Sequence, residues 1–171
     1  MTPVILLERL KEFTLSTTGD LLLPVSMKDG DTEQSYRNAD VYLTRLPDSR
    51  SAKKKAPYIL HQLITEKDIH KPQQRMESVA CVRSIFCVYH SDEQEGGLAL
   101  LNLMGRLRIE LLRRRTIGGQ FTLDLESGLE TLVYPGENLE SYYAGEMISV
   151  WKLPTIEREV NYVEKGNSNF K

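Results

Sequence analysis

The sequence predicts an α/β fold of the α+β type, a mixed and mainly antiparallel sheet with two principal helices packed against it and an extended loop arm. Apolar residues recur at helical spacing in two segments, 3–13 and 92–115. Two runs, 58–64 and 79–89, are rich in the β-branched and aromatic residues typical of strands. Residues 121–125 alternate between apolar and polar, which indicates a strand with one buried face.

Length and charge narrow the classes of function. The chain has 171 residues, which predicts one domain over 1–171 with a core of ordinary size. It carries 22 Lys and Arg against 24 Asp and Glu, a net charge of -2 that gives no global attraction to nucleic acid or to an anionic membrane. The apolar runs fall short of the roughly 20 residues that a bilayer requires, so we expect no membrane partner.

The N-terminal region combines a helix with a long polar stretch. Thr2 is a candidate N-cap and Pro3 suits the first helical position, so a short amphipathic helix is expected from there. Residues 16–56, called the arm below, are dominated by turn and loop chemistry, and only 21–25 and 41–46 resemble strands. A stretch of this length in a compact domain predicts a functional segment held in place by contacts.

The two strand-like runs at the centre carry apolar residues on both faces. In 79–89, Val79 and Ile85 alternate with Ala80 and Phe86. This pattern predicts central strands covered on both sides, with the polar residues 67–75 as the connection between 58–64 and 79–89.

The second helix has clear end signals. Ser91 and Gln94 form a capping-box pattern at its start. Three arginines lie at its end, and Gly118-Gly119 after them are expected to stop the helix. The expected core stripe is apolar throughout: Leu100, Leu101, Met104, Leu107, Leu111 and Leu112.

The C-terminal third predicts a hairpin, a strand and a tail. Segments 121–125 and 129–134 are separated by Glu126-Ser127-Gly128, which indicates a hairpin with one buried face. A last strand over 146–153 contains Trp151, which we expect in the core, and ends at Pro154. Residues 154–171 are then a tail that can reach another subunit.

No motif for catalysis, metal binding or a cofactor is evident. The three histidines, His61, His70 and His90, lack metal-ligand spacing with one another or with the cysteines. No glycine pair is followed by the Lys-Ser/Thr of a phosphate-binding loop. We therefore expect no catalytic residue, no metal and no cofactor.

The two cysteines, Cys81 and Cys87, lie in one predicted strand. Six residues of strand separate them by about 20 Å, too far for a disulfide, so they are expected to be free buried thiols of a chain that folds in a reducing cytoplasm. A nucleophilic pair of either cysteine with a histidine from another strand is the alternative.

Several residues are candidates for contact with a subunit or another partner. Most have a second interpretation: the three consecutive arginines suit helix capping, the lysines a solvated loop or passing nucleic acid, and the tyrosines the core. The candidates are Arg113, Arg114, Arg115, Lys53, Lys54, Lys55, Tyr142, Tyr143, Glu157 and Arg158.

Three segments together resemble tail terminator (tail completion) proteins of long-tailed phages and phage-tail-like particles. They are 98–115, Ile117-Gly118-Gly119-Gln120-Phe121-Thr122-Leu123, and 143–154 with Ile156-Glu157-Arg158-Glu159. The resemblance covers about the C-terminal half, and the arm does not match the family pattern. It implies an α/β fold whose subunits form a ring, a hexamer in the family, that caps the tail tube and stops its polymerisation.

The resemblance also implies partners and a location. The partners are further copies of the chain and the tail tube protein, with sheath and neck or collar proteins as further candidates, while DNA only passes through the ring. The location is the virion or a phage-tail-like particle assembled in the host cytoplasm. Two other interpretations stay open: another neck or baseplate structural protein, and a small cysteine-dependent hydrolase that uses Cys81 or Cys87.

Overall fold

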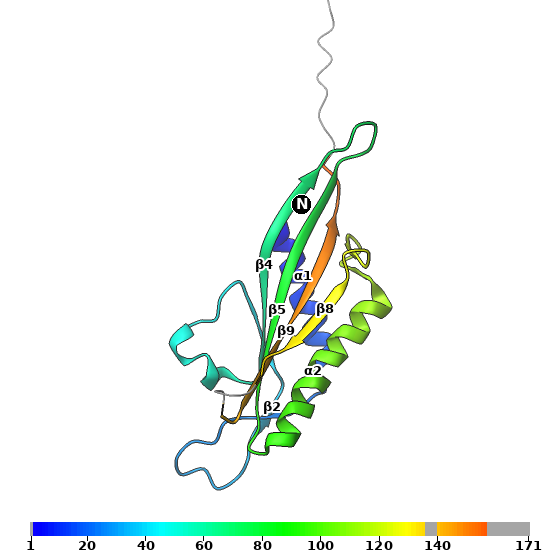
Figure 1. Ribbon diagram of the computed structural model, residues 1–171. Coiled ribbons are helices and arrows are strands. Elements are labelled where there is room, and N and C mark those ends of the chain that lie inside the picture. The colour runs from blue at the N-terminus through cyan, green and yellow to red at the C-terminus, as the bar shows by residue number, and fades with distance from the viewer. Residues whose placement is uncertain (1, 136–139, 157–171) are drawn as a thin grey trace, which may run out of the picture.

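The computed structural model describes residues 2–135 and 140–156, and it has the predicted α+β architecture (Figure 1). Helix α1 spans Pro3–Thr18 and helix α2 spans Glu93–Arg114. Both helices pack on the same face of a seven-stranded, mostly antiparallel sheet. Their buried residues form one hydrophobic cluster with those of the sheet. The predicted fold class, a mixed sheet with two principal helices, is therefore confirmed.

The sheet is built around three long strands. These are β4 (Tyr58–Ile69), β5 (Glu77–Tyr89) and β9 (Tyr142–Leu153), each antiparallel to the next. β3 (Asp40–Leu43) lies beside the start of β4 and forms the only parallel pair among the described strands.

On its other side, β9 pairs with two short strands in succession. They are β8 (Leu129–Val133) and β7 (Phe121–Leu123), and β6 (Thr116–Ile117) extends the sheet beyond β7. The predicted hairpin of 121–125 with 129–134 is therefore wrong. Asp124 accepts hydrogen bonds from Glu126 N (3.2 Å) and Ser127 Oγ (2.7 Å), and this turn shifts the chain along the edge of β9 without reversing it.

The hydrophobic core lies between the sheet and the two helices. Alternate residues of β5 and β9 face the helices, and Trp151 is 0% exposed as predicted. The largest side chains of this core are Trp151, Phe86, Phe121, Leu6, Leu10, Ile59, Leu100, Leu103 and Leu107.

The opposite face of the sheet, called the open face below, is covered by no α-helix of the described residues. Near the start of β4, Leu46 and Ala56 of the arm cover Tyr58, Leu60 and Cys87. Further along, the side chains remain half-buried, for example Val79, Cys81, Ile85, Ile148 and Val150. The prediction that the central strands are covered on both sides is thus wrong for most of their length. The apolar residues on both faces predicted that other elements would cover both faces of these strands. In the structure, the two helices cover one face, and the arm covers only one end of the open face.

The arm is ordered by pairing within itself and with the body. β1 (Leu23–Pro24) pairs with β2 (Tyr36–Arg37), and the side chain of Asn38 donates hydrogen bonds to the carbonyls of Gly19 (2.8 Å) and Leu21 (3.0 Å). Two short 3-10 helices, Ser49–Ser51 and Lys53–Lys55, precede β4. The two strand-like patches predicted in the arm correspond to β1 and β3.

The long hairpin of β4 and β5 extends past the helices (Figure 1). The sequence predicts the end of the first strand near Ile64, but β4 continues to Ile69 through a bulge between Leu63 and Thr65. Residues 64–68 are exposed, so hydrophobicity gives no signal for this extension.

Helix α2 differs from its prediction at both ends and on one face. Asp92 is the N-cap, one residue later than the predicted Ser91, and its Oδ1 accepts from the backbone of Gln94 (2.9 Å) and Glu95 (3.0 Å). Arg115, in the left-handed region at φ 57°, ends the helix before the predicted glycines. Leu101, which was predicted in the core, is 53% exposed, and Leu103 is buried there instead.

Candidate subunit interface

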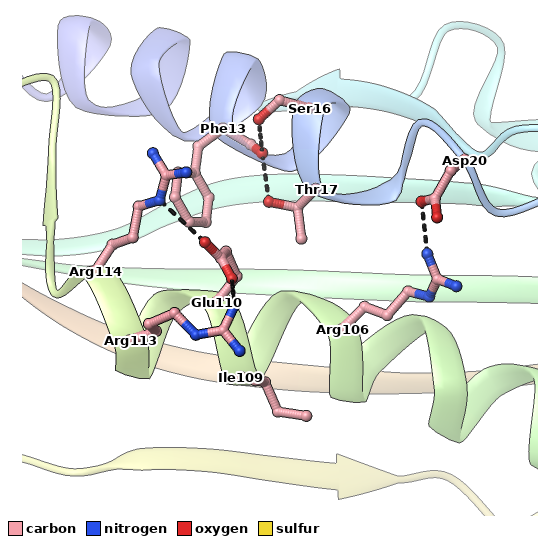
Figure 2. Close-up of a pocket in the computed structure, with 9 residues that line it drawn as sticks. All are labelled: Phe13, Ser16, Thr17, Asp20, Arg106, Ile109, Glu110, Arg113 and Arg114. Atoms are coloured by element: carbon pink, nitrogen blue, oxygen red, sulfur yellow. Dashed lines mark hydrogen bonds and ion pairs between the residues drawn. The ribbon is translucent and has the colours of Figure 1, made fainter.

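An open cleft between the end of α1 and the last turns of α2 contains the first group of predicted interface residues (Figure 2). Its volume is about 460 Å³. Arg106, Arg113 and Arg114 line it from α2, and Phe13 and Asp20 line it from the other side. Three guanidinium groups thus meet two carboxylates, those of Asp20 and Glu110.

The arginines of the cleft have partners within the chain. Arg113 Nη1 lies 2.6 Å from Glu110 Oε2, and Arg114 Nε lies 3.0 Å from Glu110 Oε1. Arg114 also stands over the ring of Phe13, 6.0 Å from its centroid. Since Arg113 and Arg114 are 69% and 65% exposed, their outer N–H groups remain open to another anionic group.

Two further arginines of this region make one contact each within the chain. Arg106 Nη1 lies 2.5 Å from Asp20 Oδ1, and this hydrogen bond lowers the pKa of the exposed Asp20 carboxyl. Arg115 is exposed, and its backbone N–H donates to Leu111 O at 2.8 Å, which satisfies one of the last carbonyls of α2. This bond uses the backbone of Arg115 and not its guanidinium, while Arg113 and Arg114 bind one carboxylate together.

The second group of predicted interface residues lies on the open face, near the arm. Lys53 Nζ is 5.8 Å from the centroid of the Tyr142 ring, and Tyr142 stacks edge-on against Tyr89 at 5.4 Å. Lys54 is exposed and Lys55 is half-buried in the same 3-10 turn. The structure thus joins Lys53 to Tyr142, two residues that are far apart in the sequence.

Tyr143 points to the other face of β9. It packs beside the hydrophobic core, and its ring lies where a side chain at Gly96 of α2 would project. Adjacent residues of a strand face opposite ways, so only one of the two tyrosines can share the surface of Lys53. Glu157 and Arg158 lie outside the described residues.

A buried polar network that the sequence did not predict connects α1 to the sheet. His61 is 0% exposed, its Nδ1 lies 2.7 Å from Ser84 Oγ, and its Nε2 lies 3.0 Å from Thr14 Oγ1. Thr14 donates its own hydroxyl proton to Leu10 O (2.7 Å), so it accepts from Nε2–H. Nδ1 then accepts from Ser84, and burial lowers the pKa of His61 to about 3.

The serine and histidine of this network resemble a nucleophile and its base, but their position serves structure. His61 and Ser84 are both buried between the sheet and the helices. A nucleophile must reach a substrate, whereas these groups satisfy one another. The sequence gives no signal for this network, because Thr14 and Ser84, the partners of His61, come from elements that are distant in the chain.

The cysteines and His61 lie on opposite faces of the sheet. Cys81 and Cys87 alternate with the residues that face the helices, which puts them on the open face, whereas His61 faces α1. Burial raises the pKa of the Cys87 thiol to about 11 and also raises the pKa of Cys81. Neither cysteine therefore forms a nucleophilic pair with His61, and neither thiol is activated by its surroundings.

A further cluster occupies the centre of the open face. Arg83 Nε lies 2.7 Å from Glu146 Oε2 without the alignment of a hydrogen bond, and Tyr134 Oη donates to the same oxygen at 2.5 Å. Arg83 Nη2 donates to Tyr134 Oη at 3.1 Å. These three side chains cross-link β5, β9 and the residue after β8 on the open face.

Within residues 2–135 and 140–156, no group of three or more His, Cys, Asp or Glu side chains is arranged to hold a metal ion. Among the helices of the same residues, none combines the length and the hydropathy that crossing a bilayer requires. Comparison of the chain with protein-family models and with curated protein sequences gave no match.

Proposed function

We propose that this chain is the subunit of a structural ring that caps the tail tube of a phage or a phage-tail-like particle, ends tube polymerisation and joins the tail to the neck. The proposal starts from the resemblance of the C-terminal half to tail terminator proteins. The α+β fold, with two helices on one face of a mixed sheet, agrees with the fold that this resemblance implies.

The observation that carries the proposal is a second apolar stripe on α2, on the side turned away from the core. Leu98, Leu101 and Ile109 are 59%, 53% and 53% exposed. They belong to the segment that carries the resemblance, and Arg113 and Arg114 follow them on the same helix. Large apolar side chains grouped with arginines are typical of protein interfaces, whereas a monomer gains nothing from exposing them.

The mass of the purified protein and its behaviour with tail tubes test the proposal. We expect native mass spectrometry to detect a closed oligomer, and electron microscopy to show rings at the ends of added tubes. A protein that stays monomeric at all concentrations and ignores tubes would contradict the proposal. Rings at the baseplate end of intact particles would favour a baseplate protein instead.

A matched pair of variants connects the test to the helix. Leu98→Glu with Leu101→Glu puts charge on the second stripe and should weaken assembly without unfolding the protein. Val4→Glu on α1, at a residue that is 60% exposed, is the control and should leave assembly unchanged. Equal behaviour of the two variants would remove α2 from the interface.

A further inference from the structure

Apart from the outer edges of the short terminal strands β3 and β6, two stretches of the described sheet have no strand partner, and each exposes large apolar residues. On one side β3 covers β4 only as far as His61, so the rest of β4 has a free edge. On the other side β8 pairs with β9 and with no further described strand. Ile64 on β4 and Leu132 and Val133 on β8 are 49%, 51% and 45% exposed.

The β8 edge lacks the usual protection against pairing. Its five residues, Leu-Glu-Thr-Leu-Val, contain no proline, no lysine and no bulge. Val133 is the register partner of Gly145, the residue beneath Met104 of α2, so it stands on the helix side of the sheet. Leu132 is on the open face. The edge therefore offers backbone hydrogen-bonding groups with an apolar side chain on each face.

We propose that β8 of one copy of this chain pairs with the free part of β4, residues 62–69, of a second copy. The proposal rests on the ring function proposed above and specifies its subunit contact. The two edges belong to opposite sides of one sheet, so the contact is head-to-tail, the type that generates a ring when its rotation closes. Pairing makes the sheet continuous from subunit to subunit.

Strand direction and charge both suit this pairing. β4, β5, β9 and β8 are successively antiparallel, so β8 runs opposite to β4. A symmetry axis roughly along the strands keeps their direction, so β8 and the neighbour's β4 are antiparallel. Lys67 and Glu130 both lie on the open face, where they bring opposite charges to the contact.

The register also allows the contact. Following the pairs across the sheet, Thr131 is level with Met147, Ser84 and then His61, the residue at which β3 stops covering β4. The free part of β4 begins one residue further along, so the neighbouring copy is displaced along the strands. Such a displacement is the shear that tilted strands of a closed sheet require.

Cross-linking between two different variants tests the contact directly. In a Cys81→Ala background, Leu132→Cys and Lys67→Cys are prepared separately, mixed under assembly conditions and treated with a short bis-maleimide. We expect linked dimers in the mixture and none in either variant alone. Linked dimers from Leu132→Cys alone would indicate a symmetric contact of β8 with β8 and would overturn the proposal, as would a mixture without linked dimers.

A second measurement separates this contact from the ring function. Leu132→Lys with Val133→Lys should raise the concentration for half-assembly by about tenfold or more, while Val4→Lys, at an exposed apolar residue of α1 outside both proposed contacts, serves as the control. Rings that persist in the double variant overturn the β8–β4 contact and leave the ring function standing. A cross-linked dimer of the two different cysteine variants, in a protein that does not bind tail tubes, supports the β8–β4 contact and contradicts the tail function.

Discussion

His61 in β4 donates its Nε2 proton to the hydroxyl of Thr14 in α1, at 3.0 Å and without access to water. This bond joins the first helix to the sheet inside the buried core. The imidazole is neutral because its surroundings offer one acceptor and one donor, an arrangement that fits a single tautomer. A second proton would have to replace the hydrogen bond from Ser84.

Stability should therefore decrease as the pH falls below about 6.5. Burial lowers the pKa of His61 from 6.5 to about 3, so between these values the unfolded chain binds a proton that the folded chain does not. The sign is a loss of stability with acid, about 2 kcal/mol between pH 7 and pH 5. Urea denaturation at several pH values measures it.

Two variants assign this pH dependence to one residue. His61→Gln removes the titrating group, and its stability should change less between pH 7 and pH 5 than that of the natural chain. His70→Gln, at an exposed position in the β4–β5 connection, should leave the slope unaltered. If His61→Gln keeps the full slope, the acid sensitivity comes from other groups.

Thr14→Val should destabilise the protein by about 1–3 kcal/mol, because it leaves the buried Nε2–H of His61 without an acceptor. The control is Thr17→Val, whose hydroxyl donates to Phe13 O at the half-buried surface of the same helix. The control should change the free energy of unfolding by less than about 0.5 kcal/mol. Equal losses in thermal or urea denaturation would mean that helix propensity, and not the network, determines the effect.

Two adjacent glycines of α2 should respond oppositely to alanine. A methyl group at Gly96 would overlap the ring of Tyr143, so Gly96→Ala should cost about 1–3 kcal/mol. Gly97 has nothing within 4 Å of the same position, so Gly97→Ala should stabilise the helix by up to about 1 kcal/mol. Adding Tyr143→Leu should recover part of the loss from Gly96→Ala, and no recovery would mean that the ring is not the obstacle.

The thiols should react slowly in the folded protein. Burial raises the pKa of both, to about 11 for Cys87, so few thiolates are present at neutral pH. We expect a disulfide reagent to modify the half-buried Cys81 first and Cys87 only after unfolding. A thiol that reacts rapidly below pH 7 in the native protein would instead support the cysteine-dependent hydrolase.

The parts of the fold that could be predicted are those in which local pattern and burial agree. Helix α1, the core position of Trp151 and the apolar parts of β4 and β5 follow from periodicity. The end of the β4–β5 hairpin does not, because its exposed residues carry no hydrophobic signal. β7 and β8 each pair with β9 because of the turn at Asp124 between them. A turn motif in the sequence does not reveal whether the strands on its two sides pair with each other or with a third strand.

The candidate site shows the same division. The sequence identified Lys53 and Tyr142 separately, but only the fold brings them together. The apolar pattern of α2 predicts Leu101 in the core, where the structure does not place it. Apolar residues cover more of the circumference of α2 than the sheet and α1 can bury, so the apolar pattern alone does not show which of them face solvent. The network of His61 could not be predicted, since Thr14 and Ser84 are ordinary residues until the helix lies on the sheet.

Replacing the arginines at the end of α2 should weaken assembly more than folding. Arg113→Ala with Arg114→Ala removes two exposed cations while Glu110 stays half-buried, so we expect a loss of stability below about 1 kcal/mol and a larger loss of ring formation. Arg115→Gly is the matched control, because glycine keeps the left-handed end of the helix and removes only the charge. Analytical ultracentrifugation at low and high salt measures both. Unchanged assembly in the double variant would restrict these arginines to their contact with Glu110.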